Sequence, residues 1–244
     1  MLSVWPLMGA VGLFGVGVGM VYKSVVVVCL SVMVLLSVLG VWGVDGVFSM
    51  VDSESGFEGG TMPWGVGLFI FSELMIFVSV LGGSGYLGSG VSEVSGFSSM
   101  LSGPIEVDYA GVGLFASVLL LSSGVSLTWA HAALLVGDGR WFVVGESVSV
   151  VLGGVFVVLQ YYEWSEMMFS WEWGSAGSMF FLATGLHGFH VLIGVLMNSL
   201  SSLVMGLWGM SWGSVEGVEA AMWYWHFVDL VWLGVFLVVY WYSL

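Results

Sequence analysis

Long apolar stretches separated by short polar segments run along the whole chain. A helix needs about 20 apolar residues to cross about 30 Å of hydrocarbon. Acidic residues gather between the stretches, as expected of helices whose backbone groups must bond internally in lipid. The pattern predicts an all-α membrane protein with seven transmembrane helices in a single domain, residues 1–244. The predicted spans are approximately 4–22, 24–44, 63–83, 109–136, 141–162, 174–204 and 218–243.

The last predicted span has aromatic residues at both ends. Residues 223–225 read Trp-Tyr-Trp and residues 240–242 read Tyr-Trp-Tyr. Trp241 lies 18 positions after Trp223, which is about 27 Å of helix at about 1.5 Å per residue. This spacing is typical of two aromatic belts at opposite membrane interfaces.

Small residues recur on one face of the first predicted span. Gly12, Gly15 and Gly19 are about one turn apart, and small residues allow helices to approach closely in lipid. The alternative is a general compositional bias toward Gly, Val and Ser. The sequence does not separate these two interpretations.

Composition and charge support a membrane protein and exclude several classes of function. Of the 244 residues, 59% are hydrophobic and 7% are charged, whereas a soluble domain has about 25% charged residues. The net charge is −14 and the only basic residues are Lys23 and Arg140, so nucleic-acid binding is excluded. Cys29 is the only cysteine, which excludes an internal disulfide.

Glu73 lies near the middle of the third predicted span. A carboxylate at that depth costs about 3 kcal/mol on insertion scales, so we expect it to face the protein interior. One interpretation is a carboxyl group that exchanges protons or contacts lipid. The other is a neutral acid that hydrogen-bonds to a neighbouring helix.

The four histidines are the other candidate functional residues inside the spans. His187 and His190 are three residues apart and share a helix face, while His131 and His226 lie on other spans. A metal or haem site is one interpretation, but metal binding needs further ligands. We favour hydrogen bonds that tie helices together, including a polar clasp formed by His226 and Asp229.

Two further acidic residues, Glu54 and Glu219, are candidates for polar or lipid contacts. Glu163 and Glu166 close the fifth span, where we expect a solvated helix end rather than a cation site. The sequence contains no nucleophile elbow, no His-Glu-x-x-His motif and no phosphate loop. We therefore expect no catalytic residue and no metal site in this chain.

Several local motifs occur in the order found in one known family. They are Trp5-Pro-Leu7, Glu54-Ser-Gly-Phe-Glu-Gly59, Phe71-Ser-Glu73, Ser123-Gly-Val-Ser-Leu-Thr-Trp-Ala-His131 followed by Gly137-Asp138 and Arg140, Ala183-Thr-Gly-Leu-His-Gly-Phe-His-Val-Leu-Ile-Gly194, Trp223-Tyr-Trp-His-Phe-Val-Asp-Leu-Val-Trp232 and Tyr240-Trp-Tyr242. Together they cover nearly the whole chain, and the chain resembles subunit III of cytochrome c oxidase.

The resemblance implies a fold and an accessory role. It implies that a V-shaped, lipid-filled cleft separates the first two helices from the other five, and that Glu73 is the family's buried membrane carboxylate. It implies that subunit III carries no cofactor, because haem and copper belong to partner subunits. It also implies packing against subunit I, contacts with subunit II and further subunits, bound phospholipids and support of proton uptake. The expected location is the mitochondrial inner membrane, with the bacterial plasma membrane as the alternative.

Two segments depart from the family pattern. Asp52-Ser-Glu-Ser-Gly-Phe-Glu58 and the end of the sixth span, Met197 to Leu207, contain no basic residue. Recognition of lipid phosphates by charge is therefore not expected there. Trp, Ser and backbone N–H groups are left to bind zwitterionic lipids, and tight cardiolipin binding is disfavoured.

Two other classes of function are weighed against this role. One is a stand-alone haem or metal membrane protein that uses His131, His187, His190 and His226. The other is a proton-coupled transporter centred on Glu73. Such transporters typically contain repeated halves or paired broken helices, and the sequence shows neither.

Overall fold

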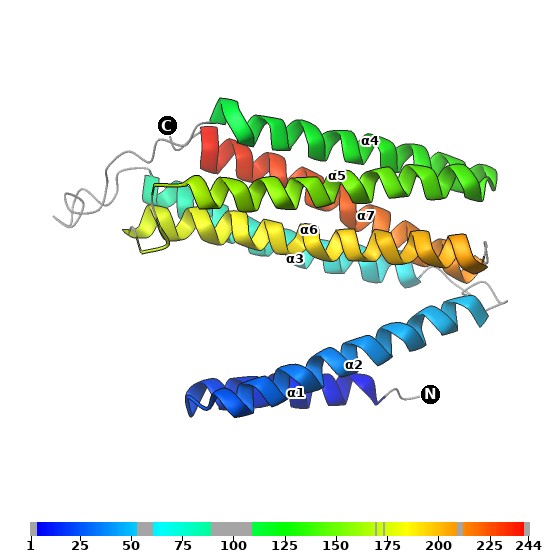
Figure 1. The fold of residues 1–244 in the computed structure, drawn as a ribbon, viewed down its shortest axis with the longest axis horizontal. Coiled ribbons are helices and arrows are strands. Elements are labelled where there is room, and N and C mark those ends of the chain that lie inside the picture. Colours follow the sequence, from blue (N-terminus) through cyan, green and yellow to red (C-terminus); the bar gives the residue numbers. More distant parts are fainter. Residues whose placement is uncertain are drawn as a thin grey trace. The chain divides into compact units, whose positions relative to one another are not determined.

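The computed structural model describes residues 4–52, 61–88, 109–168, 170–172, 174–208 and 212–241. Within these ranges the regular structure consists of seven α-helices and two short π-helical segments, with no strand (Figure 1). The elements are α1 (Trp5–Val21), α2 (Val25–Asp52), α3 (Thr61–Gly88), η3 (Tyr109–Gly113), α4 (Leu114–Val136), α5 (Gly139–Glu166), α6 (Gly174–Trp208), α7 (Trp212–Val235) and η4 (Phe236–Trp241). The predicted all-α fold with seven helices is confirmed.

Five of the helices are long and apolar enough to cross a membrane. Their candidate spans are Trp64–Gly83, Gly111–Val136, Gly139–Glu166, Gly177–Leu207 and Gly217–Trp241. Shorter apolar stretches lie in α1 and α2, at Leu7–Val21 and Val25–Val38. The assignment of all 244 residues to one transmembrane domain stays a prediction, because the chain divides into two compact units, Met1–Gly56 and Phe57–Leu244.

The first unit contains the α1–α2 hairpin. Its turn places Lys23 at a positive φ of 51°, and the Ser24 N–H donates to the Gly19 carbonyl at 2.9 Å. The glycine stripe of α1 faces α2: a Cβ on Gly12 would lie 2.8 Å from Leu35 Cγ, and one on Gly19 would lie 2.7 Å from Val28 Cγ2. The interpretation of this stripe as a site of close helix approach is confirmed.

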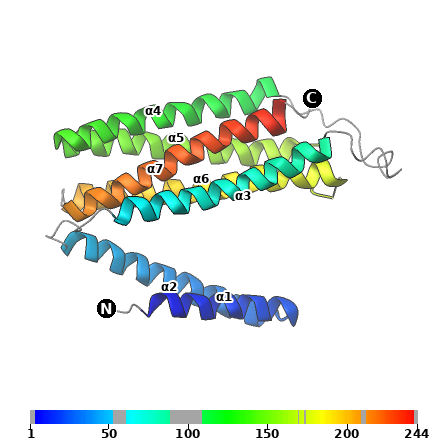
Figure 2. The same cartoon turned by 180° about the vertical axis from the view of Figure 1, so that it is seen from behind.

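The second unit consists of two layers of helices. Helices α5 and α6 form one layer, and α4, α7 and α3 form the other, with α7 in the middle (Figures 1 and 2). Helix α7 packs against α3, α4 and α6, and it buries most of its side chains, whereas α3 leaves most of its side chains exposed. The unit is therefore organised around its last helix.

A tight turn sets α4 and α5 side by side. Gly137 ends α4 in the left-handed region, with φ at 83°, a conformation that glycine adopts without a steric penalty. Asp138 then caps α5, because its side chain accepts hydrogen bonds from the backbone N–H groups of Arg140 and Trp141 at 3.2 and 3.4 Å. The motif Gly137-Asp138 thus acts locally, as a helix stop followed by a helix start.

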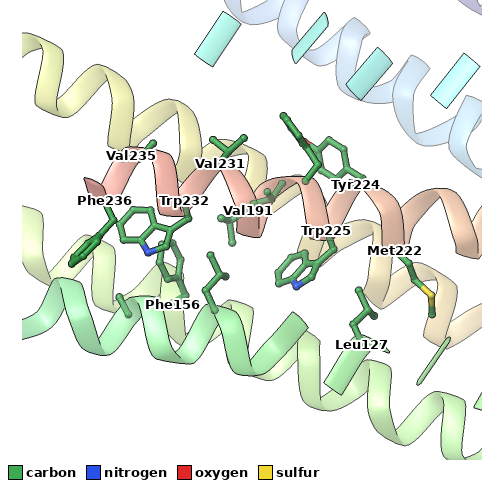
Figure 3. Packing of buried hydrophobic residues seen from close by; sticks show 14 of the residues in the cluster. Leu127, Phe156, Val191, Met222, Tyr224, Trp225, Val231, Trp232, Val235 and Phe236 are labelled. Carbon is green, nitrogen blue, oxygen red and sulfur yellow. The ribbon is translucent and has the colours of Figure 1, made fainter. Parts of the chain in front are cut away.

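Two tryptophans seven residues apart on α7 set its register against α4 and α5. Trp225 and Trp232 are fully buried and both point toward α4 and α5 (Figure 3). Trp225 Nε1 donates to Ser123 Oγ at 3.0 Å, and Trp232 Nε1 donates to Ser117 Oγ at 2.9 Å. Each indole therefore has a hydrogen-bond partner on α4.

Glycines make room for the Trp225 ring. A Cβ on Gly194 of α6 would lie 2.6 Å from Trp225 Cε3, and one on Gly153 of α5 would also clash with the ring. By contrast, a Cβ on Gly188 of α6 would have no atom within 4 Å. The two glycines next to Trp225 are therefore packing residues.

We predict that Gly194→Ala destabilises the protein, whereas Gly188→Ala does not. Forcing a methyl group into a filled space costs about 1–3 kcal/mol, whereas alanine in an open helical position gains up to about 1 kcal/mol over glycine. The measurement is the loss of helical circular dichroism on heating in detergent. Equal midpoints for the two variants would show that Trp225 does not restrict the space at Gly194.

Candidate functional site

Glu73 of α3 and His190 of α6 form a hydrogen-bonded pair between two helices. Glu73 Oε2 and His190 Nε2 are 2.9 Å apart, and the two side chains are 19% and 8% exposed. His190 Nδ1 lies 2.7 Å from the Leu186 carbonyl oxygen. Because a carbonyl oxygen only accepts hydrogen bonds, Nδ1 carries a hydrogen, and Nε2 faces the carboxyl group.

This geometry allows one proton to lie on either side of the contact. A neutral carboxyl group can donate to Nε2, or a protonated imidazole can donate to the carboxylate. Both arrangements have no net charge, which lowers the cost of holding the pair in hydrocarbon. Glu73 and His190 can therefore act together as a proton-exchanging unit or as a helix contact.

Aromatic rings surround the pair. The Phe77 ring lies 5.1 Å from the imidazole of His190 in a T-shaped arrangement, and the Tyr224 ring of α7 stacks at 6.3 Å. Phe77 is buried and also packs against Phe227 of α7. Helices α3, α6 and α7 thus surround the Glu73–His190 pair. Of the two side chains, Glu73 is the more exposed.

His187 does not join His190 in a common site. It is fully buried, and its Nε2 donates to the Val228 carbonyl oxygen at 3.3 Å. Its ring contacts the Phe156 and Trp232 rings at 5.5 and 4.8 Å, and these two rings also contact each other. The expected shared helix face is present, but His187 contacts α7 whereas His190 contacts α3. Both histidines form contacts between helices, as the favoured interpretation expected.

Two other candidate pairs connect α4 with α7. His131 Nε2 and Glu219 Oε1 are 3.8 Å apart, and both side chains are 37% exposed. Asp229 is buried. If Gly124 of α4 carried a Cβ atom, that atom would lie 2.5 Å from Asp229 Oδ2 and 3.7 Å from His226 Nδ1. His226 and Asp229 therefore approach α4 at Gly124, where only a glycine leaves room.

The candidate residues are thus distributed over separate helix contacts. Among the described residues, no group of three or more His, Cys, Asp or Glu side chains is arranged to hold a metal ion. Glu54, with the motif that contains it, and Tyr242 lie outside the described residues. The structure brings together Glu73 with His190 and His131 with Glu219, but it does not bring the four histidines together.

The expected solvated helix end is wrong for Glu163. Its side chain is 7% exposed, and its Oε2 accepts hydrogen bonds from Tyr240 Oη at 2.8 Å and Gln160 Nε2 at 3.0 Å. Tyr240 belongs to η4, which continues the last helix beyond Val235 and so supplies a partner for Glu163. Glu166, three residues later, is exposed as expected.

Sequence reasoning missed one buried carboxyl group. Glu146 lies inside the fifth predicted span, 141–162, and is fully buried on α5. Its Oε1 accepts a hydrogen bond from Ser201 Oγ of α6 at 2.8 Å. The signal that could have found it is the one that identified Glu73, an acidic residue within an otherwise apolar span.

Comparisons with known proteins place the whole chain in one family. A family model described as cytochrome c oxidase subunit III matches residues 1–244. The chain is 34% identical to cytochrome c oxidase subunit 3 of Anopheles gambiae over 265 residues, which cover 99% of this chain and 94% of the relative. The same protein of Drosophila melanogaster is 34% identical over 249 residues, with the same coverage. That of Pylaiella littoralis is 33% identical over 260 residues, with 99% and 92% coverage.

These matches agree with the order of motifs along the chain and with its all-helical fold. The expected resemblance is confirmed: the chain belongs to the cytochrome c oxidase subunit III family.

Proposed function

We propose that this chain supports the redox subunit of its complex by keeping a proton-exchanging pair, Glu73 and His190, in the membrane next to that subunit. Its family makes it a component of cytochrome c oxidase, an oxidoreductase complex. The proposed role is accessory, with stabilisation, lipid binding and support of proton uptake as its parts. The observation that carries it is the 2.9 Å contact between Glu73 Oε2 and His190 Nε2.

The balance of charges in the pair supports proton exchange. The Glu73–His190 contact contains a proton that can move between two atoms without changing the net charge, and Glu73 is 19% exposed. A fully buried pair could not exchange its proton with another molecule. A fully exposed pair would face lipid tails, which neither donate nor accept protons. Partial exposure is consistent with a proton donor or acceptor, or a lipid headgroup, reaching the carboxyl group.

The proposed partners are subunits I and II of the oxidase, further subunits of the complex, and phospholipids. Helix α3 supports this proposal because large apolar side chains along it are exposed, among them Trp64, Leu68 and Phe71. These side chains need an apolar neighbour, which lipid or another subunit supplies. The lipid-filled cleft, Glu54 as a lipid contact, and the preference for zwitterionic lipids belong to the same proposal.

Haem and copper are proposed to lie in the partner subunits. The histidines that could bind such groups already serve the helix contacts of this chain: His187 donates to Val228, and His190 contacts Glu73. The proposed location is the mitochondrial inner membrane, with several membrane crossings. Eukaryotic relatives such as those of the two insects support it over a bacterial plasma membrane.

Replacing Glu73 by glutamine tests the proton-exchange role. A glutamine amide can still donate to His190 Nε2, so the α3–α6 contact should weaken by no more than about 1 kcal/mol. The exchangeable proton is lost, and we expect lower turnover and proton pumping, or altered lipid content, in the assembled complex. Oxygen consumption, proton release and bound phospholipid are the measurements.

Glu166→Gln is the matched control for this variant. It makes the same substitution at a glutamate that is exposed at the end of α5. It should leave all three measurements unchanged. Wild-type turnover, pumping and lipid content in Glu73→Gln would eliminate the proton and lipid role of Glu73, and the pair would then be a helix contact only.

Affinity purification of the chain in mild detergent tests the proposed partners. We expect it to retain proteins with the optical spectra of haem and copper, and to lose those spectra once the chain is separated from the partners. A Soret band that stays with the isolated chain would contradict the accessory role and favour a haem protein that uses its own histidines.

A further inference from the structure

A second polar cluster lies between α5 and α6, separate from the Glu73–His190 pair. Glu146 of α5 is 0% exposed and Asn198 of α6 is 1% exposed. Ser201 Oγ lies 2.8 Å from Glu146 Oε1, 2.8 Å from the backbone carbonyl oxygen of Met197 and 3.2 Å from that of Asn198. Asn198 is three residues before Ser201 and therefore shares its face of α6. Asn198 is eight residues beyond His190, which is about 12 Å along the helix. This cluster is therefore a distinct feature of the bundle.

Three buried atoms of this cluster lack a partner among the described residues. They are Glu146 Oε2, Asn198 Nδ2 and Asn198 Oδ1. In native proteins the large majority of buried polar atoms are paired with protein or with ordered water. A carboxyl oxygen and a whole amide group at one helix interface therefore point to a bound molecule with polar groups.

Whether each of these atoms donates or accepts hydrogen bonds decides which kind of molecule can bind them. The carboxyl and amide oxygens accept hydrogen bonds, whereas Asn198 Nδ2 donates them. A metal cation would satisfy the oxygens and leave the amide N–H groups unpaired, and an apolar molecule would satisfy neither. Water both donates and accepts, and a buried water typically makes about three hydrogen bonds.

Hydroxyl groups also lie at the exposed edge of the same helix contact. Ser147 of α5 is exposed, and its Oγ lies 3.5 Å from Ser202 Oγ of α6. These two serines directly follow Glu146 and Ser201 in the sequence. The α5–α6 contact therefore contains two polar pairs, one at its exposed edge and one at the buried carboxyl group.

Among the described residues, no basic side chain pairs with the Glu146 carboxyl group. Arg140 is the only basic residue near this part of α5 in the sequence, and it is exposed six residues before Glu146, about 9 Å along the helix. The ion pairs among the described residues are the two histidine pairs already named, neither of which includes Glu146. Glu146 thus lies in the membrane without a counter-ion.

We propose that Glu146, Asn198 and Ser201 form a water-binding site inside the membrane-spanning bundle. The site makes Glu146 a hydrated carboxyl group inside the bundle. It does not depend on the role proposed for the Glu73–His190 pair, and each can fail without the other.

A double-mutant cycle in the assembled complex tests the site. Glu146→Leu and Asn198→Leu should each lower the temperature at which the chain is lost from the detergent-solubilised complex, because each leaves the other side chain buried with fewer partners. The double variant removes both polar groups and should lower that temperature by less than the sum of the two single shifts. Additive shifts would overturn the proposal.

Gln160→Leu provides the matched control. Gln160 is buried on the same helix but pairs with Glu163, and it lies 14 residues from Glu146, about 21 Å along α5. Its shift should add to that of Asn198→Leu, because distant sites without shared partners are independent.

A high-resolution map of the wild-type complex decides the identity of the bound molecule, including where a variant fails to assemble. We expect water density within hydrogen-bond distance of Glu146 Oε2 and the Asn198 amide, and its loss in the double variant. An Asn198 amide turned to bond Glu146 directly would contradict the proposal. So would density that disappears when sodium and potassium are replaced by a large organic cation.

Discussion

Polar groups in hydrocarbon must find partners within the protein, and the arrangement of this chain depends on that constraint. The Nε1–H groups of Trp225 and Trp232 bond to serines of α4, and the His187 ring bonds to the backbone of α7. The first two contacts join α4 with α7, and the third joins α6 with α7. Because apolar side chains gain little from leaving lipid for one another, such contacts select which helix faces meet.

Helix α7 shows how hydrogen bonding and packing act together. Its two buried indoles are seven residues apart, so they lie on the same face, and their serine partners lie six residues apart on the antiparallel α4. A shift of α7 by one turn would leave both indole N–H groups unpaired and would move Trp225 away from the space at Gly153 and Gly194. Register is thus fixed by two hydrogen bonds and by one large ring.

The same constraint explains why the polar residues are spread over the bundle. Glu73 pairs with His190, Glu163 with Tyr240 and Gln160, and Glu146 with Ser201. The three carboxyl groups therefore bond to four different residues, on α5, α6 and the end of the last helix.

The sequence alone determined the all-α class, the number of helices and the family, because hydropathy and local motifs follow directly from the order of residues. The glycine stripe of α1 was recognised, although only the structure identified Leu35, Ser31 and Val28 of α2 as its neighbours. Pairing between distant helices could not be read from the sequence. His187 and His190 share a helix face yet bond to different helices, Glu163 bonds to Tyr240 of η4, and Glu146 bonds to Ser201 of α6. The tertiary structure decided these pairings, because the partner of a buried polar group depends on which helices pack together and in which register.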